Sequence, residues 1–486
     1  MIQTNATQMA FPRFRMLTED QISEIVAAAM DILEKIGIKV LSAEARQMFQ
    51  DAGACVDGEI VRVPQFIVRR ALTTAPRGWT IYNRNGERAM EVTGRKSYFG
   101  TSTASPNTID PLTGEYRETR LEDIARSAAI ADALENIDWV MPMGSAQDVP
   151  STAADVHEFV AVVQRTTKPI VFCAYSGQGA KWVFDMASEV AGSPKALRER
   201  PFLVLYPEPI APLILPDHVI ERIFVAADRF LPQMMGPAMQ PGATSPVTLA
   251  GAVAQGVAES FMCLATAQLR NPGCPVGLGC NFGNFDMNQG LMGVGNPEMS
   301  LALAAQAEVA QSFGLPTWGL AGGTDAKVLD AQAGAEAAFH ALAQAQAGLN
   351  LIHDVGYMDM SMACGLEQLV LGNEIIGMVK RFLNGIEVSR DRIALEVIAR
   401  VGHGGHFLGE EHTMQYFKAE QWRPSLFTRK PHKYWEAEGA KDTRTRVREK
   451  IQNILETHEP PPLPDSVLNT LERMKQEAER EILGSA

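Results

Sequence analysis

The stretch LNLIHDVGYMDMSM, Leu349–Met362, carries the pattern that decides the fold. Its first half contains the apolar residues of a short buried strand, Leu349, Leu351, Ile352 and Val355. Polar and ionisable side chains gather at and after the end of that strand, namely His353, Asp354, Tyr357 and Asp359. Barrels of parallel strands place their functional residues at the carboxyl ends of the strands. We therefore interpret this stretch as the last strand of a closed barrel and the loop that leaves it.

Working outward, strand and helix patterns alternate through the middle of the chain. Eight apolar strand candidates are Tyr98–Thr103, Trp139–Gly144, Pro169–Tyr175, Pro201–Tyr206, Gln233–Ala238, Pro275–Cys280, Pro316–Ala321 and Asn350–Gly356. Helical patterns fill the gaps at Leu121–Leu134, Ala154–Arg165, Ala180–Val190, His218–Ala227, Leu249–Leu269, Met299–Phe313 and Ala331–Ala347. Successive strands start roughly 30 to 42 residues apart, which suits one strand and one helix per repeat.

This rhythm predicts an α/β fold, a (β/α)8 TIM barrel over residues 96–385. An open, doubly wound sheet would have the same spacing. The barrel is favoured because the strands number eight and no GxGxxG motif follows the first of them.

The segments on either side of the barrel follow other patterns. Residues 1–95 predict an α+β appendage, with a helix over Thr18–Ile36 that begins at a Thr18–Gln21 capping box, and hairpin turns at Asp57-Gly58 and Asn85-Gly86. Residues 386–486 predict a helical C-terminal extension that packs on the barrel. It contains an aromatic-rich run, a charged helix from Lys441, and a closing helix from Asp465.

Composition limits the function. The chain of 486 residues is 46% hydrophobic and can bury a large core. Its net charge of −13 argues against nucleic acid or an anionic membrane as the main partner. Six scattered cysteines without a CxxC pair indicate reduced thiols. Neither a signal peptide nor an apolar run long enough to span a membrane is recognisable, so we expect a cytoplasmic protein.

The residues that follow the predicted strands form a candidate site. We expect substrate-binding roles for Tyr175, Tyr206, Glu208, Asn281, Phe282, Phe285, Trp318 and Tyr357, and catalytic roles for His353, Asp354 and Asp359. This set has aromatic and carboxylate side chains, few cations, no phosphate loop and no metal-ligand spacing. It suits a small cation such as a quaternary ammonium, because aromatic faces attract one at ~0.5–2 kcal/mol per ring.

Each of these residues has a structural alternative. Aromatic side chains near strand ends commonly pack in the core, His353 can be satisfied by a neighbouring carboxylate, and aspartates commonly cap loops. The cluster His403, His406, Glu410, Glu411 and His412 has the residue types of a metal site. However, its HGGH run is not the helical HExxH pattern, so we expect a loop closing over the barrel and no metal.

Three runs carry a resemblance: GLAGGTDAKVLDAQAGAEAAFHAL (Gly319–Leu342), LNLIHDVGYMDMSMACGLEQLVLGNEI (Leu349–Ile375) and GHFLGEEHTMQYF (Gly405–Phe417). The chain resembles the trimethylamine methyltransferase family, specifically its members without pyrrolysine. The resemblance implies a (β/α)8 barrel that moves a methyl group from an amine nitrogen to the cobalt of a corrinoid (cobalamin) carried by a separate protein. Met360 lies at or beside the position that pyrrolysine takes in the archaeal trimethylamine enzymes.

Methionine cannot form the amine adduct that pyrrolysine makes, so the resemblance points to quaternary amines such as glycine betaine, proline betaine or carnitine-like compounds. Such a substrate already carries full positive charge and leaves as a neutral tertiary amine, so no general acid is required. If the substrate has a carboxylate, Asn281, Asn284, His353 or backbone amides are candidate donors. We also expect a homo-oligomer.

Three alternatives stay open at this point. They are a non-catalytic barrel that binds quaternary ammonium compounds, a trimethylamine demethylase that works without pyrrolysine, and a metal-dependent hydrolase that uses His403, His406 and His412.

Overall fold

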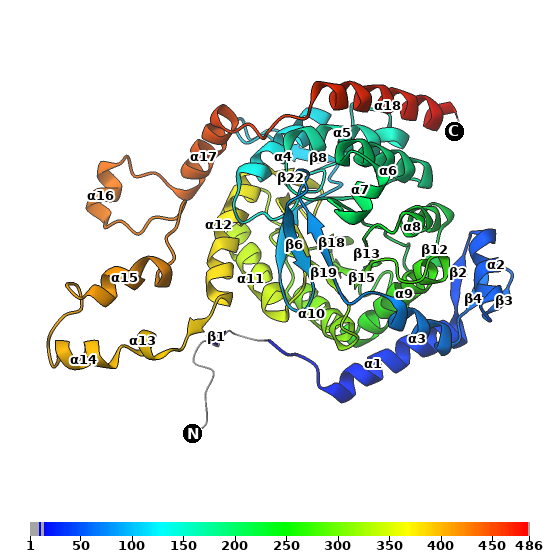
Figure 1. Cartoon of the computed structure of the whole chain (residues 1–486), viewed down its shortest axis with the longest axis horizontal. Coiled ribbons are helices and arrows are strands. Elements are labelled where there is room, and N and C mark those ends of the chain that lie inside the picture. The colour runs from blue at the N-terminus through cyan, green and yellow to red at the C-terminus, as the bar shows by residue number, and fades with distance from the viewer. Residues whose placement is uncertain (1–8, 11–13, 485–486) are drawn as a thin grey trace.

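Seven of the eight predicted strands form one parallel sheet in the computed structural model, which describes residues 9–10 and 14–484 (Figure 1). In order around the sheet they are β10 (Ile170–Phe172), β11 (Leu203–Leu205), β13 (Gln233–Met235), β15 (Val276–Gly279), β19 (Thr317–Leu320), β20 (Leu351–Val355) and β7 (Tyr98–Thr101). Successive strands are neighbours, and the last strand, β20, pairs with the first, β7. The sheet is therefore TIM-barrel-like and not doubly wound.

The remaining predicted strand, Trp139–Gly144, is not a regular strand. Single parallel bridges join Trp139 to Gly100 of β7 and Val140 to Ile170 of β10. This segment thus connects the two edge strands of the sheet. The close approach depends on Gly100, because a Cβ atom there would lie 2.3 Å from the indole ring of Trp139.

Helices surround the sheet in chain order (Figure 1). They are α4 (Leu121–Ala133), α5 (Ala154–Arg165), α6 (Gly177–Ala191), α8 (Asp217–Arg229), α9 (Leu249–Arg270), α10 (Pro297–Ser312), α11 (Ala331–Ala347) and α12 (Leu366–Leu383), with the short η2 (Ser151–Ala153) and α7 (Pro194–Glu199) between them. Each packs on the next, and α12 also contacts α4. Within the described residues, α9 alone has the length and hydropathy of a membrane span, and 83% of its apolar window is buried inside the protein.

The amino-terminal elements confirm the predicted helix and both hairpins. They are α1 (Glu19–Asp31), η1 (Ile32–Ile36), β2 (Ile38–Val40), α2 (Ala43–Asp51), β3 (Cys55–Asp57), β4 (Ile60–Arg62), α3 (Gln65–Thr74), β5 (Trp79–Tyr82) and β6 (Arg88–Val92). Thr18 and Gln21 make the capping box, and Gly37 ends the helix with a φ of +86°. Helices α1, α2 and α3 pack on α9, and β12 (Ile214–Leu215) pairs with β2.

The β5–β6 hairpin closes the amino-terminal end of the barrel-like sheet. The amides of Tyr82 and Arg84 donate to the carbonyls of Pro201 and Thr167, which lie just before β11 and β10. Ile81 and Met90 pack with Trp318 and other side chains inside the sheet. One end of the sheet is therefore filled, which leaves the carboxyl ends of the strands as the position for a site.

Short strands that the sequence did not predict lie beyond the carboxyl ends. One sheet contains β21 (Tyr357–Met358), β22 (Ala363–Gly365), β8 (Asn107–Ile109) and β9 (Tyr116–Glu118). Two further pairs there are β14 (Ala238–Met239) with β16 (Asn281–Phe282), and β17 (Asn284–Asp286) with β18 (Leu291–Gly293). These strands lie in the segments that follow the barrel strands, and they give those segments a fixed backbone. A separate pair, β1 (Met9–Ala10) with β23 (Ile386–Glu387), joins the amino-terminal segment to the chain after α12.

The carboxyl-terminal helices divide into two groups. Helices α17 (Thr443–Thr457) and α18 (Asp465–Gly484) pack on the outside of α4 and α12 and of α5 and α6, respectively. Helices α13 (Arg390–Ile393), α14 (Leu395–Val401), α15 (Glu411–Glu420) and α16 (His432–Ala437) extend away from the barrel (Figure 1). The histidine-rich run lies among this second group and is exposed, so the expectation that it closes over the barrel is wrong for this structure.

Candidate active site

Two aromatic rings form the floor of the site. Tyr206 follows β11, Trp318 lies in β19, and their rings stack with centroids 4.8 Å apart and planes inclined by 19°. The ring of Trp139, which sequence reasoning treated only as part of a strand, lies 5.5 Å from that of Trp318. All three side chains are buried and pack with the apolar interior of the sheet. The aromatic residues at the strand ends are thus both core and site floor.

His353 lies one layer above this floor. Trp318 pairs with Leu351 across the sheet, so His353, two residues further along β20, points to the same side nearer the carboxyl end. Its ring centroid is 4.5 Å from that of Trp318, and its Nδ1 lies 2.7 Å from Oδ1 of Asp354. Both side chains are buried, and among the described residues neither ring nitrogen of His353 nor Oδ1 of Asp354 has a hydrogen-bond partner, although Nδ1 and Oδ1 lie within ion-pair distance. Nε2 of His353 is therefore available to a ligand.

Asn281 connects the floor to a carboxylate. Its side-chain oxygen accepts a hydrogen bond from Nε1 of Trp318 at 3.2 Å, which fixes the orientation of the amide. Its Nδ2 then donates to the hydroxyl of Tyr206 and, at 3.3 Å, to Oε1 of Glu208. The indole and the amide thus hold Glu208 beside the aromatic stack.

Burial raises the pKa of Glu208 above its ordinary value. Asn281, His353 and Arg222 oppose this increase, and Asp354 adds to it. Arg222 is a buried residue of α8 whose guanidinium donates to the carbonyl of Ala174. We did not predict it, although Arg222 falls on the same apolar face of its helix as Val219 and Ala226, where a charge is unusual.

The other predicted residues lie in different places. Tyr357 is buried, and its hydroxyl donates to the carbonyl of Thr103. Phe282 packs in the main hydrophobic core, near Gly256 of α9. Phe285 lies on the β17–β18 hairpin and is half-buried. Only Tyr357 of these three belongs to the surroundings of His353 and Glu208, because the charges of Asp354 and Glu208 act on its hydroxyl.

The loop after β20 has an unusual backbone. Asp359, Met360 and Ser361 have φ values of +51°, +55° and +68°, and such a run of left-handed residues without glycine is uncommon. The Asp359 carboxylate is held from outside the aromatic cluster, by the hydroxyl of Tyr116 at 3.2 Å and by Nζ of Lys327 at 3.3 Å. Asp359 therefore anchors the loop in this structure, and Met360 lies at its bend.

Tyr175 belongs to a second acidic cluster, which the sequence did not reveal. Its amide donates to Oδ2 of Asp155 at 2.9 Å, and its hydroxyl lies 3.3 Å from that of Ser145. Burial raises the pKa of Asp155 to about 6 and that of Glu158 to about 8, and the charge of Asp155 also raises the latter. Oε1 of Glu158 accepts a hydrogen bond from the amide of Ala146 at 2.9 Å.

In the described part of the chain, no group of three or more His, Cys, Asp or Glu side chains is arranged to hold a metal ion. Of the tail histidines, His412 contacts the carbonyl of Asp391 at 3.2 Å through Nε2. His403 and His406 are exposed on the outlying segment.

Comparisons with known proteins agree on one family. The family model described as trimethylamine methyltransferase (MTTB) matches residues 2–482. The trimethylamine methyltransferase MttB of Desulfitobacterium hafniense is 32% identical over 466 residues, covering 96% of this chain and 94% of that protein. A glycine betaine methyltransferase of the same species is 30% identical over 454 residues, covering 93% and 94%.

A solved structure has the same kind of fold. The monomethylamine methyltransferase MtmB of Methanosarcina barkeri superposes with a TM-score of 0.52, covering 96% of this chain and 89% of that one. At 11% sequence identity, this likeness concerns the fold alone.

Proposed function

The chain belongs to the trimethylamine methyltransferase family, and we propose that it moves a methyl group from a quaternary amine, such as glycine betaine, to the Co(I) corrinoid of a partner protein. The family match covers nearly the whole chain, and the chain is a methyltransferase on that ground. The similarity to a glycine betaine methyltransferase, together with methionine at position 360, supports a quaternary amine as the substrate.

The observation that carries the proposal is the convergence of aromatic rings and carboxylates at one place. Tyr206 and Trp318 stack beneath His353, and Glu208 lies beside them through Asn281. A permanent cation has no proton to donate, so it is held by aromatic faces and negative charge. Tyr357 and Asp354 complete the same surroundings, and we place the ammonium group of the substrate among these residues.

For this reaction the protein needs to bind the substrate, orient it and exclude water from the site. When bound, the reduced corrinoid supplies the nucleophile that takes the methyl group. The buried floor of Tyr206 and Trp318 keeps water from beneath the ammonium, and the rigid Asn281 contacts fix the position of Glu208. Since the tertiary amine leaves as a neutral molecule, none of these residues needs to donate a proton to it.

Because the pKa of Glu208 is raised, the affinity for a cationic substrate is expected to depend on pH. A cation bound beside the carboxyl group stabilises its ionised form, so binding favours loss of the proton. Affinity for the substrate is therefore expected to rise as pH rises through the pKa of Glu208 in the free protein. Below that pKa the carboxyl is neutral and attracts the cation less.

A substrate carboxylate would find a donor in His353. Both protons on Nδ2 of Asn281 are engaged with Tyr206 and Glu208, and Nδ2 of Asn284 donates to Glu298 at 3.1 Å. Nε2 of His353 is buried and has no partner in the described structure. We therefore assign His353 the role of orienting the carboxylate of a betaine.

A panel of methylated amines tests the proposal. The protein is mixed with cob(I)alamin, a reductant and each amine, and formation of methylcobalamin is followed by its absorption spectrum. Quaternary amines are expected to be demethylated, and trimethylamine is not. Binding of quaternary amines without methylcobalamin would show a binding protein instead, and turnover of trimethylamine alone would show demethylation without pyrrolysine.

The proposal also includes the architecture of the barrel, the division of the chain, and its cellular location and partner. The bridges at Trp139 and Val140 support a complete (β/α)8 barrel, in which Trp139–Gly144 takes the place of the second strand. We keep the division into an appendage (1–95), a barrel (96–385) and an extension (386–486), although β12 of the barrel region pairs with β2 of the appendage. We also place the protein in the cytoplasm, with a corrinoid protein as its partner.

A further inference from the structure

Residues 386–440, here called the arm, bury almost nothing within the chain. The arm contains α13, α14, α15 and α16, and none of the residues of these helices is buried against the described part of the chain. Leu426 is the one buried residue of the arm, at the point where Glu374 accepts hydrogen bonds from Ser425 and from the amide of Leu426. Figure 1 shows the arm extending outward on the side where α11 and α12 lie.

Such an arm is not stable by itself. Its helices have 4, 7, 10 and 6 residues, and isolated helices of this length are marginal in water. Large apolar side chains lie in solvent on it, with exposed fractions of 70% for Leu395, 81% for Leu408 and 67% for Met414. The apolar side chains therefore require a covering surface that the described chain does not provide.

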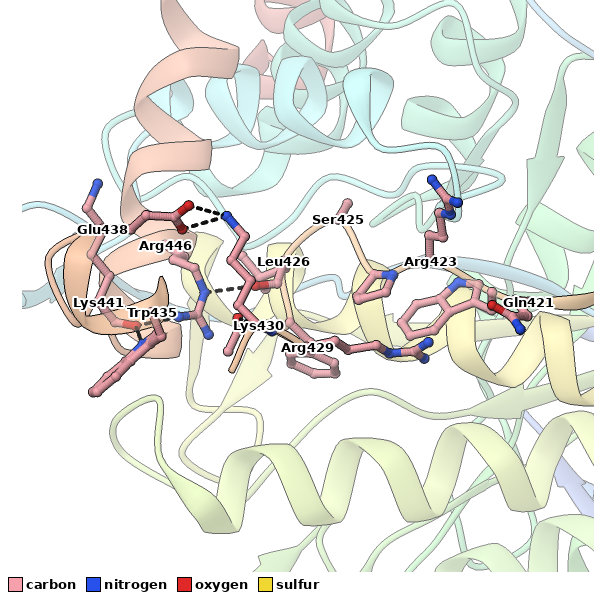
Figure 2. A pocket seen from close by; sticks show the side chains of 14 residues that line it. Gln421, Arg423, Ser425, Leu426, Arg429, Lys430, Trp435, Glu438, Lys441 and Arg446 are labelled. Carbon is pink, nitrogen blue, oxygen red and sulfur yellow. Dashed lines mark hydrogen bonds and ion pairs between the residues drawn. The ribbon is translucent and has the colours of Figure 1, made fainter. Parts of the chain in front are cut away.

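The root of the arm is nevertheless well anchored. A pocket of about 580 Å³ is lined by residues 421–430 on one side and by Trp435, Glu438, Lys441 and Arg446 on the other. Figure 2 shows the side-chain contacts that join the two sides. Arg446 donates to the carbonyl of Leu426 at 2.8 Å, and the Arg429 guanidinium lies 5.5 Å from the centre of the Trp422 ring. Trp435 donates to the carbonyl of Lys441 at 2.9 Å. These contacts give the arm a defined direction from the barrel.

Helices α11 and α12, which lie on the side of the barrel toward the arm, expose apolar side chains (Figure 1). Glu336 is the one charged residue of α11, and Phe339 on the same helix is 51% exposed. Met378 and Phe382 are exposed on the adjacent helix α12. We call Phe339, Met378, Phe382 and the outer residues of α11 the apolar face. By contrast α8, which likewise lacks a covering helix in the described structure, exposes the polar side chains of Asp217, Glu221 and Asp228.

Charge and the position of the arm together favour a second copy of this chain as the occupant of these surfaces. The arm contains eight basic and eight acidic residues, so the whole net charge of −13 belongs to the rest of the chain. Two copies of an acidic chain repel each other over most of their surfaces. The repulsion is smallest where the apolar face of one copy meets the electrically neutral arm of the other. The arm also lies beside the barrel and leaves free the strand ends, which a corrinoid partner must reach. A second copy of this chain therefore fits the arm better than that partner does.

We propose that the arm of each chain lies on the apolar face of a second copy, and that the arm of this second copy lies on the apolar face of the first. A two-fold axis makes such a contact self-complementary, so it closes without leaving an unpaired arm. Each chain then covers the apolar side chains that the other exposes.

The first test is the mass of the assembly in solution, measured by light scattering after size exclusion at micromolar concentration. The wild-type chain is expected at twice the 53.0 kDa of one chain, or at an even multiple of it. Phe339→Glu with Phe382→Glu is expected at 53.0 kDa with an unchanged circular dichroism spectrum. Phe66→Glu on α3 is the matched control, because Phe66 is 60% exposed but distant from both surfaces in sequence and fold.

A wild-type monomer would overturn the proposal, including one that assembles only after a corrinoid protein is added. Equal dissociation of the Phe66→Glu control would overturn it too, because the effect would not be specific to the apolar face.

The second test asks whether the arm meets α11 of the other chain. Leu395→Lys with Leu408→Lys on the arm is expected to give a monomer, as is Phe339→Glu alone. An equal mixture of the two variants is expected to form mixed dimers, because the lysines of one chain then face the glutamate of the other. If both variants stay monomeric in the mixture, the arm does not lie on α11 and the arrangement is wrong.

Discussion

The site at the strand ends and the arm depart from the usual distribution of side chains in opposite directions. The site buries His353, Asp354 and the carboxyl group of Glu208, and the arm exposes Leu395 and Leu408. Buried polar groups are costly unless they are paired. Asn281 pairs with Glu208 within the chain, whereas the ring nitrogens of His353 have no hydrogen-bond partner in the described structure. Exposed apolar groups need a surface from another molecule. The difference separates what one chain completes for itself from what it leaves to an interface.

The largest expected effect is on the free energy of unfolding, and it is tested by replacing one tryptophan in the site and one in the arm. Trp318→Ala is expected to reduce the free energy of unfolding by about 3–5 kcal/mol, because it leaves a cavity between Trp139, Tyr206 and His353. Trp435→Ala on the arm is expected to cost about 1 kcal/mol or less, since it removes mainly one hydrogen bond to a carbonyl. Urea unfolding measures both. Equal losses would contradict the assignment of Trp318 to the barrel interior.

The second prediction concerns stability against pH. Burial raises the pKa of Glu158 from its ordinary 4.5 to about 8, so between these values the folded protein keeps a proton that the unfolded chain loses. The free energy of unfolding therefore falls as pH rises through this window, by up to roughly 1.4 kcal/mol per pH unit.

Glu158→Gln is expected to remove this part of the slope between pH 6.5 and 7.5, because an amide keeps the acceptor for Ala146 but has no proton to lose. Glu410→Gln on the exposed arm serves as the control and should leave the slope unchanged. Identical slopes in the wild type and Glu158→Gln would show that Glu158 titrates normally in the folded protein.

The third prediction tests the charge of the site. Glu208→Gln is expected to lower kcat/KM for a quaternary amine by about 10- to 100-fold, since each factor of ten corresponds to 1.4 kcal/mol of lost attraction for the cation. Glu396→Gln on the arm makes the same chemical change in solvent and should have no effect. The wild type should also bind the amine more tightly as pH rises, and Glu208→Gln should lose that dependence.

The smallest expected effect is on KM, and it distinguishes recognition of the carboxylate of a betaine from recognition of its ammonium group. His353→Gln is expected to raise KM for glycine betaine about 10-fold and to leave KM for tetramethylammonium, which has no carboxylate, nearly unchanged. His403→Gln on the arm is the matched control. A similar loss for both substrates would mean that His353 supports the floor and does not orient the carboxylate.

Local sequence patterns predicted the elements well. The Thr18–Gln21 capping box and Gly37 set the first helix, and the hairpin turns at Asp57-Gly58 and Asn85-Gly86 are found as predicted. These features depend on neighbouring residues only, so their signals are readable in a short window. The alternation of strands and helices likewise gave the order of the barrel-like sheet, because successive repeats lie side by side.

The composition of the site depended on contacts between distant residues. Packing joined Arg222 of α8 to the surroundings of Glu208, and it gathered Asp155, Glu158 and Tyr175 into a second acidic cluster. It also turned Phe282 toward α9 and away from the site. One position on a strand decides which face a side chain takes, and a shift of one residue reverses it.

The sequence by itself determined the elements, their order, the family resemblance and the residue types of the candidate site. Only the tertiary structure decided that Trp139 bridges the sheet edges, that His353 has a free ring nitrogen over the Trp318 ring, and that the arm leaves its apolar side chains uncovered. The physical reason is that periodicity records which side of an element avoids water. It does not record which other surface, in the same chain or in another, provides the cover.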